Sequence, residues 1–234
     1  MADTIHLRPT AALADRVLLP GDPGRALRLA QSLLSEPKMF NHNRGLWGYT
    51  GIALDGEPLT IQSTGMGGPS CAIVIAELDD LGAQTVVRVG TCGALDGSLE
   101  LGQLLIATEA IAADGTSRAL GAGERVAGNP ELLRCLNPGP DVIASGTVAC
   151  SDLFYDGPDG QERLWLTAGA LAVEMETATL YALADRRGLR AASLLVVSDV
   201  IRPHRVRIDT ETLHAAERRM GEAALRALTR LSGA

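Results

Sequence analysis

The 234-residue sequence has few of the residues from which metal and redox sites are built. It contains only four cysteines and four histidines. Cys71, Cys92, Cys135 and Cys150 lie far apart and form no C-x-x-C pair, and the histidines show no ligand spacing. We therefore expect no metal site, no redox motif and no cofactor built on one. Isolated cysteines with small or apolar neighbours are typical of core thiols in a reducing cytosol.

The sequence also lacks the marks of a membrane or nucleic-acid-binding protein. No uninterrupted apolar run is long enough to span a bilayer. The first residues lack the basic-then-apolar pattern of a signal peptide. The formal net charge is −7 and no basic block stands out, which argues against a nucleic-acid-binding surface. We expect a cytoplasmic protein with no membrane or nucleic-acid partner. If such an acidic chain binds an anion, it needs a local cluster of arginines.

The chain does contain alternating β-like and α-like segments, and hydrophobic residues make up 46% of it. The patterns predict strands near residues 17–19, 49–54, 59–63, 86–89, 103–108, 142–148, 171–173 and 192–197. They predict helices near residues 25–34, 71–81, 131–136, 175–187 and 211–231, with the rest of 112–141 and residues 198–210 as loop. Strands that alternate with helices indicate a three-layer α/β/α fold around a central mixed, mostly parallel twisted sheet. With no repeat or linker, we expect a single domain over residues 1–234.

The most informative residue is Arg88, which lies in a segment otherwise typical of a buried parallel strand. A guanidinium there stays charged and must be paired. One interpretation is an internal ion pair with a carboxylate. The other is an anion site, because Thr91 adds a hydroxyl donor at the carboxyl end of the strand, where open α/β sheets bind ligands.

A second arginine follows an earlier strand, in the segment 21–25 (GDPGR). Its glycines free backbone N–H groups, and Arg25 lies at a helix N-terminus; both features suit an oxyanion, although a plain strand-to-helix turn has the same composition. Two arginines at the ends of two strands can converge on one anion, and the guanidinium fork matches phosphate. Arg44 is a third candidate, for which an ordinary surface position is the default.

Carboxylates follow two further strands. A buried glutamate in the segment 173–176 (VEME) can accept hydrogen bonds from two adjacent sugar hydroxyls, although glutamates at helix N-termini are common. Asp199 ends a fully apolar strand, where partial desolvation favours the protonated form and suits a general acid; a turn or N-cap is the alternative. The segment 65–68 (GMGG) allows close backbone approach to a ligand but does not fit a dinucleotide fingerprint.

Taken in order, seven segments resemble the trimeric and hexameric nucleoside phosphorylase family, specifically its bacterial purine-type members. They are 21–25 (GDPGR), 43–45 (NRG), 65–67 (GMG), 88–93 (RVGTCG), 151–155 (SDLFY), 173–176 (VEME) and 197–199 (VSD). Each is weak alone, but together they span nearly the whole chain. The resemblance implies a phosphorylase/hydrolase-like fold and reversible, phosphate-dependent cleavage of purine (deoxy)ribonucleosides to free base and (deoxy)ribose 1-phosphate. It implies no cofactor, with inorganic phosphate as co-substrate.

The resemblance also implies a role for each matching residue. The phosphate-binding set is Gly21, Arg25, Arg44, Arg88 and Thr91. The ribose-binding set is His6, Met66, Glu174, Met175 and Glu176. The base-binding set is Cys92, Gly93, Phe154, Val173 and Ser198, with Phe154 stacking on the base and Asp199 protonating it at N7. His6 and Arg44 are implied to act in the site of a neighbouring subunit, so the resemblance predicts a homo-oligomer, at least a dimer and in the hexameric type a trimer of dimers.

Several points stay open in the sequence. Arg202, Arg205, Arg207 and Arg218 all compete to assist Asp199, and the preferred base is not fixed. Uridine phosphorylase is the nearest alternative, favoured by Thr91 and by residues 161–163 (QER). A nucleosidase that uses water would leave the arginines without an anion. An NAD-dependent oxidoreductase lacks its glycine fingerprint, and a non-catalytic nucleoside-binding module would bind ligand without turnover.

Overall fold

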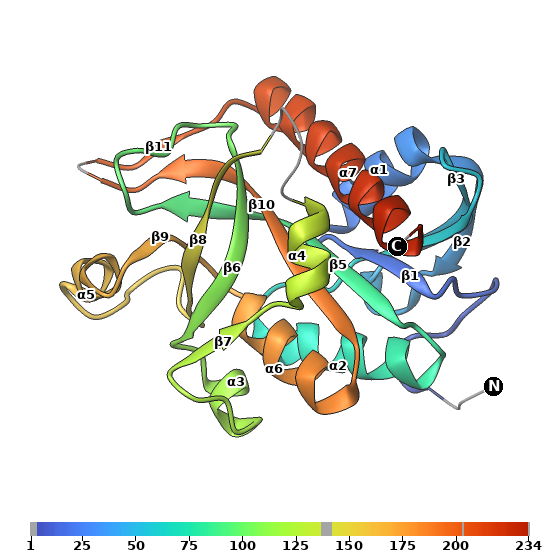
Figure 1. The fold of residues 1–234 in the computed structure, drawn as a ribbon, viewed down its shortest axis with the longest axis horizontal. Helices are drawn as coiled ribbons and strands as arrows, with labels where there is room; N and C mark the ends of the chain where they lie inside the picture. Colours follow the sequence, from blue (N-terminus) through green and yellow to red (C-terminus); the bar gives the residue numbers. More distant parts are fainter. Residues whose placement is uncertain (1–3, 137–141, 203, 234) are drawn as a thin grey trace.

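The computed structural model describes residues 4–136, 142–202 and 204–233 (Figure 1). Its strands are β1 (Arg16–Leu19), β2 (Leu34–Asn41), β3 (Gly48–Ala53), β4 (Pro58–Gln62), β5 (Thr85–Ala94), β6 (Leu104–Ala112), β7 (Arg125–Ala127), β8 (Val142–Cys150), β9 (Ala170–Glu174), β10 (Arg190–Val200) and β11 (Val206–Arg207). Its helices are α1 (Pro23–Leu33), α2 (Gly68–Asp80), α3 (Gly115–Ala119), α4 (Pro130–Leu136), α5 (Gln161–Thr167), α6 (Thr177–Arg187) and α7 (Thr210–Ser232), with a 3-10 turn η1 (Asn43–Gly45).

All these strands belong to one mixed sheet. The central pairings β1–β4, β1–β5, β5–β10, β6–β8 and β8–β9 are parallel. Antiparallel pairings join β10 to β6, β5 to β9, and the hairpin strands at the margins. Because β5 pairs with both β10 and β9, the strands β5, β10, β6, β8 and β9 close into a ring. The predicted mixed α/β fold with a central sheet is confirmed.

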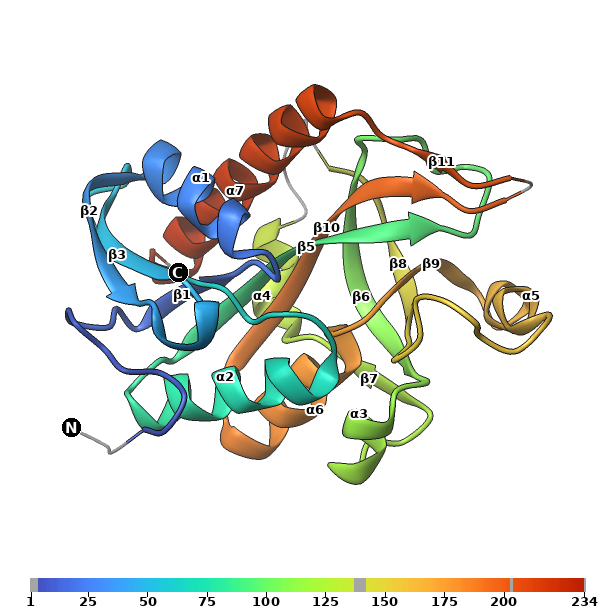
Figure 2. The ribbon, with the colours of Figure 1, turned by 180° about the vertical axis from the view of Figure 1, so that it is seen from behind.

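Helices cover the sheet on two sides, seen from front and back in Figures 1 and 2. One hydrophobic core packs α2 and α6 against the sheet, and a second packs α1, α4 and α7 against it. On β5 the side chains of Val87 and Val89 enter the second core, and Val86 enters the first. This alternation is what a strand covered on both faces requires. It leaves Arg88 as a charge on a face that is otherwise apolar.

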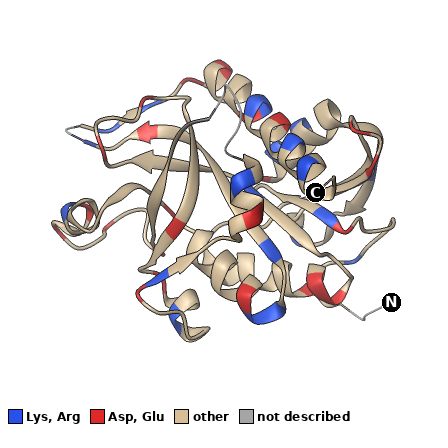
Figure 3. Ribbon diagram, in the orientation of Figure 1, with Lys and Arg blue, Asp and Glu red and all other residues tan. Residues whose placement is uncertain are grey.

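Charged residues lie mainly on helices and connecting segments, and the central strands carry few of them (Figure 3). The structure corrects several predicted elements. β2, β7, α3, α5 and β11 were not predicted; β2 is an edge strand that contains Pro37, and β11 is only two residues long. β5 continues through its Gly-Thr-Cys-Gly segment to Ala94 because both β9 and β10 pair with that segment.

Two predicted helix starts were wrong, each for a local reason. The helix predicted from Cys71 begins at Gly68 with Gly67 as N-cap, and Ser70, inside its first turn, donates its hydroxyl to the Thr64 carbonyl oxygen. The helix predicted from Met175 begins at Thr177. Its first N–H groups are satisfied by the Glu174 side chain, which accepts from the backbone N–H of Glu176 and of Thr177, so Glu174 acts as the cap.

Candidate active site

One cavity of about 480 Å³ lies where β1, β5, β9 and β10 end. Every predicted site residue except His6 and Arg44 lines it: Gly21, Arg25, Met66, Arg88, Thr91, Cys92, Gly93, Phe154, Val173, Glu174, Met175, Glu176, Ser198 and Asp199. The sheet register explains the convergence, because Gly93 of β5 is opposite Val173 of β9 on one side and Asp199 of β10 on the other. β9 runs antiparallel to β5, so the residues after Val173 travel back along β5 towards Arg88.

Arg88 forms the internal ion pairs that one interpretation of its sequence context required. Its Nε lies 3.0 Å from Glu174 Oε2, and its Nη2 lies 2.5 Å from Glu176 Oε2. Arg88 is only 4% exposed. Burial opposes its charge, but the two glutamates outweigh burial and raise its pKa, so Arg88 stays charged. A Cβ on Gly90 would lie 2.6 Å from Arg88 Cζ, so Gly90 makes room for the guanidinium.

Arg88 lines the cavity in addition to forming these ion pairs. Arg25 is in the same situation. Its Nε donates to Glu217 Oε1 at 2.7 Å, its Nη1 donates to the Val89 carbonyl oxygen at 3.3 Å, and it also lines the cavity. Both arginines are therefore held by protein acceptors and line the same cavity.

The expectation that the segment 21–25 offers free backbone N–H groups is wrong for two of them. Asp22 is the N-cap of α1, and its carboxylate accepts from the N–H of Gly24 at 3.0 Å and of Arg25 at 2.8 Å. An N-cap aspartate satisfies the donors that an oxyanion would otherwise use. The Arg25 side chain, which lines the cavity, is thus better suited to an anion than the capped N–H groups of Gly24 and Arg25.

Glu176 connects the arginine end of the cavity with its mouth. Its Oε1 accepts from the backbone N–H of Gly67 at 2.5 Å, while its Oε2 pairs with Arg88. Burial raises its pKa, and Arg88 only partly offsets this. Each oxygen keeps a lone pair for a further donor. Met66, which is 85% exposed, lies at the mouth beside it.

Asp199 lies directly after a bulge in β10. The register of β10 on β5 shifts between Val197 and Asp199, which leaves Ser198 as the extra residue. The Ser198 hydroxyl lies 2.8 Å from Asp199 Oδ2. Arg207 Nε lies 3.3 Å from Asp199 Oδ1, but the contact is not aligned as a hydrogen bond. Within the described ranges, this buried oxygen has no hydrogen-bond partner.

The structure separates the four arginines that competed for a place beside Asp199. Arg207 is directly opposite Asp199 in the antiparallel pair of β10 and β11, and its side chain is 76% exposed. The Arg205 guanidinium lies over the Phe154 ring, 4.8 Å from its centroid. Arg202 lines a neighbouring polar pocket, and Arg218 is exposed on α7. In this structure Arg207 is thus the arginine at contact distance from Asp199.

Comparison with known proteins shows the family to which this chain belongs. The family model described as the phosphorylase superfamily matches residues 15–232. The chain belongs to the phosphorylase superfamily. The resemblance carried by the seven sequence segments is confirmed.

Three proteins similar to this superfamily member carry the names of nucleoside phosphorylases. A purine nucleoside phosphorylase DeoD-type from Geobacillus kaustophilus is 38% identical over 206 residues, covering 85% of this chain and 86% of that protein. A guanosine phosphorylase from Halorubrum lacusprofundi is 38% identical over 185 residues, covering 77% and 76%. Among solved structures, a uridine phosphorylase from Vibrio fischeri ES114 has a TM-score of 0.84 at 26% identity, covering 98% of this chain and 99% of that one.

In this superfamily member, His6 and Arg44 do not line the cavity of their own chain. His6 Nδ1 lies 2.7 Å from Glu77 Oε1, and Glu77 also accepts from the backbone N–H of Leu7. Arg44 is exposed in η1 and has a left-handed backbone, φ 57°. These are the two residues for which the family resemblance implies a role in the site of a neighbouring subunit.

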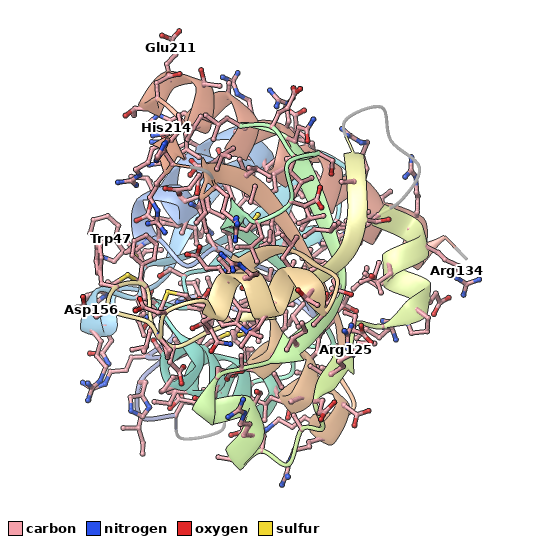
Figure 4. All side chains as sticks on the ribbon, turned by 90° about the vertical axis from the view of Figure 1, so that its left-hand side faces the viewer. Trp47, Arg125, Arg134, Asp156, Glu211 and His214 are labelled. Atoms are coloured by element: carbon pink, nitrogen blue, oxygen red, sulfur yellow. The ribbon has the colours of Figure 1, made fainter. Side chains whose placement is uncertain are left out.

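The far end of the cavity is built from the segment before α5 and from α5 itself. Phe154 is 50% exposed and packs edge-on against Tyr155. Figure 4 looks onto α5 and labels Asp156, in the segment before it, and Arg125 on β7. Arg125 donates to the Ala168 carbonyl oxygen just after α5 and pairs with Glu109 at 2.6 Å, so β7 and β6 hold the end of this helix.

The sequence patterns assigned no site role to several residues that line the cavity: Asp22, Pro23, Gly65, Leu153, Trp165 and Ile201. They also assigned none to Glu217, which lies behind Arg25. The signal for Glu217 was present, because it is a charged residue on the apolar face of the predicted last helix, three and four positions before Met220 and Gly221. Ile201 packs closely over Gly93: a Cβ on Gly93 would lie 2.6 Å from Ile201 Cδ1.

The described residues contain no group of three or more His, Cys, Asp or Glu side chains placed to hold a metal ion. The same part of the chain contains no helix that is both long enough and apolar enough to cross a bilayer.

Proposed function

We propose that this protein cleaves purine ribonucleosides and deoxyribonucleosides with inorganic phosphate, releasing the free base and the pentose 1-phosphate in a reversible reaction. The observation that carries the proposal is that the two arginines, the two glutamates and Asp199 all line one cavity of about 480 Å³. That volume is in the range typical of small-molecule sites, about 300–1,000 Å³. The names of the curated relatives support the purine assignment.

In this proposal, phosphate binds between Arg25 and Arg88, with Thr91 as hydroxyl donor and Gly21 close by. Both guanidinium groups are held in place before phosphate arrives, Arg25 by Glu217 and Val89, and Arg88 by Glu174 and Glu176. Preorganised donors stabilise charge without reorganisation at the moment of reaction. The phosphate then stabilises the oxocarbenium character at C1′ of the sugar and attacks that carbon, so no covalent enzyme intermediate is needed.

The proposed ribose site is formed by Met66, Glu174, Met175 and Glu176. Glu176 is the group that accepts from the sugar hydroxyls, because each of its oxygens keeps a free lone pair beside its present contact. Glu174 has the supporting role, since its oxygens are occupied by Arg88 and by the N-terminal N–H groups of α6.

The proposed base site is formed by Cys92, Gly93, Phe154, Val173 and Ser198, with Asp199 as general acid towards N7. The buried Asp199 Oδ1 has no hydrogen-bond partner in the described part of the chain, which supports its role towards a group of the substrate. A general acid contributes about 10²–10⁴-fold to a rate. Burial raises the pKa of the Cys92 thiol, so we assign it a packing role and no nucleophilic one.

We further propose that the protein is a homo-oligomer, at least a dimer and in the fullest form a hexamer, with His6 and Arg44 acting in a neighbouring site. Charge supports this. The cations of Arg25, Arg28 and Arg88 are matched within the chain by Glu174, Glu176 and Glu217. A phosphate dianion added to this balanced set calls for a further cation, and the exposed Arg44 can supply it from another subunit. Residues 1–234 would form one domain, and a cytoplasmic location stays a prediction.

Uridine phosphorylase is the second candidate, supported by the Vibrio fischeri structure. Of residues 161–163, which favoured it in the sequence, only Glu162 lines the main cavity, whereas Gln161 and Arg163 line the neighbouring polar pocket. The purine assignment is therefore the better supported.

The test is base release from adenosine, inosine, guanosine and uridine, each with and without phosphate. The proposal expects release from at least one purine nucleoside, only when phosphate is present. Cleavage of uridine alone would transfer the assignment to uridine phosphorylase, and release without phosphate would make the enzyme a nucleosidase. Sedimentation analysis of the purified protein tests the assembly; a fully active monomer would contradict the roles of His6 and Arg44.

A further inference from the structure

Glu217 on α7 contacts the proposed phosphate site from behind, without lining the cavity. Its Oε1 accepts from Arg25 Nε at 2.7 Å. Its Oε2 accepts from Arg28 Nε at 3.1 Å and from Arg28 Nη2 at 2.7 Å. We infer that Glu217 is a positioning residue that sets the affinity for phosphate by orienting Arg25; the inference rests on the proposed function.

The burial of Glu217 makes a passive surface role untenable. It is only 2% exposed, and a carboxylate buried to that degree destabilises the fold unless it is paired. It is paired on both oxygens, which leaves the carboxylate fixed between two guanidinium groups. One carboxylate shared between two guanidinium groups holds Arg25 in place.

Arg25 donates hydrogen bonds to two acceptors. Its Nε donates to Glu217, and its Nη1 donates to the Val89 carbonyl oxygen at 3.3 Å. These two contacts fix the orientation of the guanidinium of a residue that also lines the cavity. Loss of the Glu217 contact would leave Arg25 with one backbone acceptor and free to rotate, so the bidentate geometry that matches phosphate would be lost.

A separate feature of α7 brings Glu217 within reach of the arginines on α1. Gly221 lies one turn after Glu217 on the same face, and a Cβ there would be 2.5 Å from Leu29 Cδ2 and 3.1 Å from Leu33 Cδ1. Leu29 lies one turn after Arg25 on α1. Because Gly221 has no side chain, α7 approaches α1 closely at this point, and the carboxylate reaches the arginines one turn away.

The experiment compares Glu217→Gln and Glu217→Asp with the wild type, and uses Asp55→Asn as the matched control. Asp55 also belongs to a close Arg–carboxylate pair, 2.7 Å from Arg16, and its Oδ2 accepts from Thr229 on α7 at 2.6 Å. It therefore tests whether loosening α7 is enough to weaken phosphate binding. The readouts are KM for phosphate, KM for nucleoside, and the phosphate-induced rise in Tm measured without nucleoside.

We expect Glu217→Gln to raise KM for phosphate by about tenfold or more, the range for losing one charge-assisted hydrogen bond, with KM for nucleoside nearly unchanged. Glu217→Asp keeps the charge but is one methylene shorter, and it should give a smaller rise. The Asp variant decides the question if the Gln variant does not fold. Asp55→Asn should lower Tm and leave KM for phosphate unchanged.

Wild-type affinity for phosphate in a folded Glu217→Asp or Glu217→Gln variant would overturn the inference. An equal rise of both KM values, or the same phosphate effect in Asp55→Asn, would also overturn it, because either result indicates a merely structural role. Failure of the proposed function looks different: the wild type itself would then show no phosphate-induced rise in Tm and no phosphate-dependent turnover.

Discussion

Arg88 Nη2 lies 2.5 Å from Glu176 Oε2, so one buried ion pair joins the proposed phosphate arginine to the proposed ribose carboxylate. The same guanidinium contacts Glu174 through Nε. The two interpretations of Arg88 in the sequence, internal ion pair and anion ligand, are therefore not exclusive. An ion pair that lines a cavity holds the arginine charged and oriented, and its substitution is expected to affect both stability and phosphate binding.

The first prediction concerns Arg88→Lys, which keeps the charge but loses the planar fork that reaches two carboxylates and a phosphate. We expect KM for phosphate to rise by about 10–100-fold, the equivalent of about 1.5–3 kcal/mol for a hydrogen bond to a charged group. Steady-state kinetics with each substrate varied in turn measures this. Arg16→Lys is the control, because Arg16 pairs with Asp55 away from the cavity. A rise confined to nucleoside KM would contradict the phosphate assignment.

The second prediction is that Asp199→Asn lowers kcat for purine nucleosides by about 10²–10⁴-fold, because the amide cannot deliver a proton to the base. KM for phosphate should change little, since Asp199 lies at the base end of the cavity. The substitution should lower kcat less for nucleosides whose base can leave without protonation than for adenosine. Weakened phosphate binding with intact turnover would contradict the role of Asp199.

The third prediction separates the arginines near Asp199. Arg207→Ala should lower kcat by about two- to fivefold and no more, because ion pairs of a solvent-exposed arginine contribute about 0.2–1 kcal/mol. Arg202→Ala is the control from the same connection, and it should leave kcat unchanged. A much larger loss in Arg218→Ala would instead assign the partner of Asp199 to α7.

The fourth prediction concerns pH and stability. The hydrogen bond from Arg16 lowers the pKa of Asp55 from 3.8 to about 2. An acid whose pKa is lowered on folding stabilises the fold above its unfolded pKa and loses that contribution as pH falls through its folded pKa. Asp55→Asn should thus be less stable than the wild type by about 2 kcal/mol at neutral pH, converted at 1.36 kcal/mol per pKa unit.

The difference in the free energy of unfolding between wild type and Asp55→Asn should reach its full size above about pH 4 and shrink towards pH 2. Denaturant unfolding at pH 7 and at pH 3 measures it. A difference that stays constant over this range would mean that the Asp55 charge does not act through Arg16.

Local patterns were sufficient to predict much of the fold and the cavity. Valine-rich strands covered on both faces predicted the central sheet, and the polar residues that end β1, β5, β9 and β10 predicted most of the cavity wall. The residues of β1, β5 and β10 converge because the register of parallel strands brings their carboxyl ends to one edge, and β9 joins them by its antiparallel pairing with β5. Arg88 was informative because a charge in an apolar strand requires a partner.

The remaining features depend on contacts that no local pattern contains. Glu217 meets Arg25 across 192 positions of sequence. Arg207 reaches Asp199 only because β11 folds back on β10 next to a bulge. α5 follows a glycine- and aspartate-rich segment that is typical of loop, and it was missed although it supplies Glu162 and Trp165 to the cavity. β2 carries a proline and exposed charged residues, so its pattern resembled a loop.

The most direct test of phosphate-dependent nucleoside cleavage is the identity of the sugar product. Phosphorus NMR of a reaction with a purine nucleoside and inorganic phosphate, run beside quantification of the free base, gives the ratio of ribose 1-phosphate to base. We predict one ribose 1-phosphate for each base released, and reformation of nucleoside when both products are supplied. Free ribose in place of ribose 1-phosphate, with base release independent of phosphate, would contradict it.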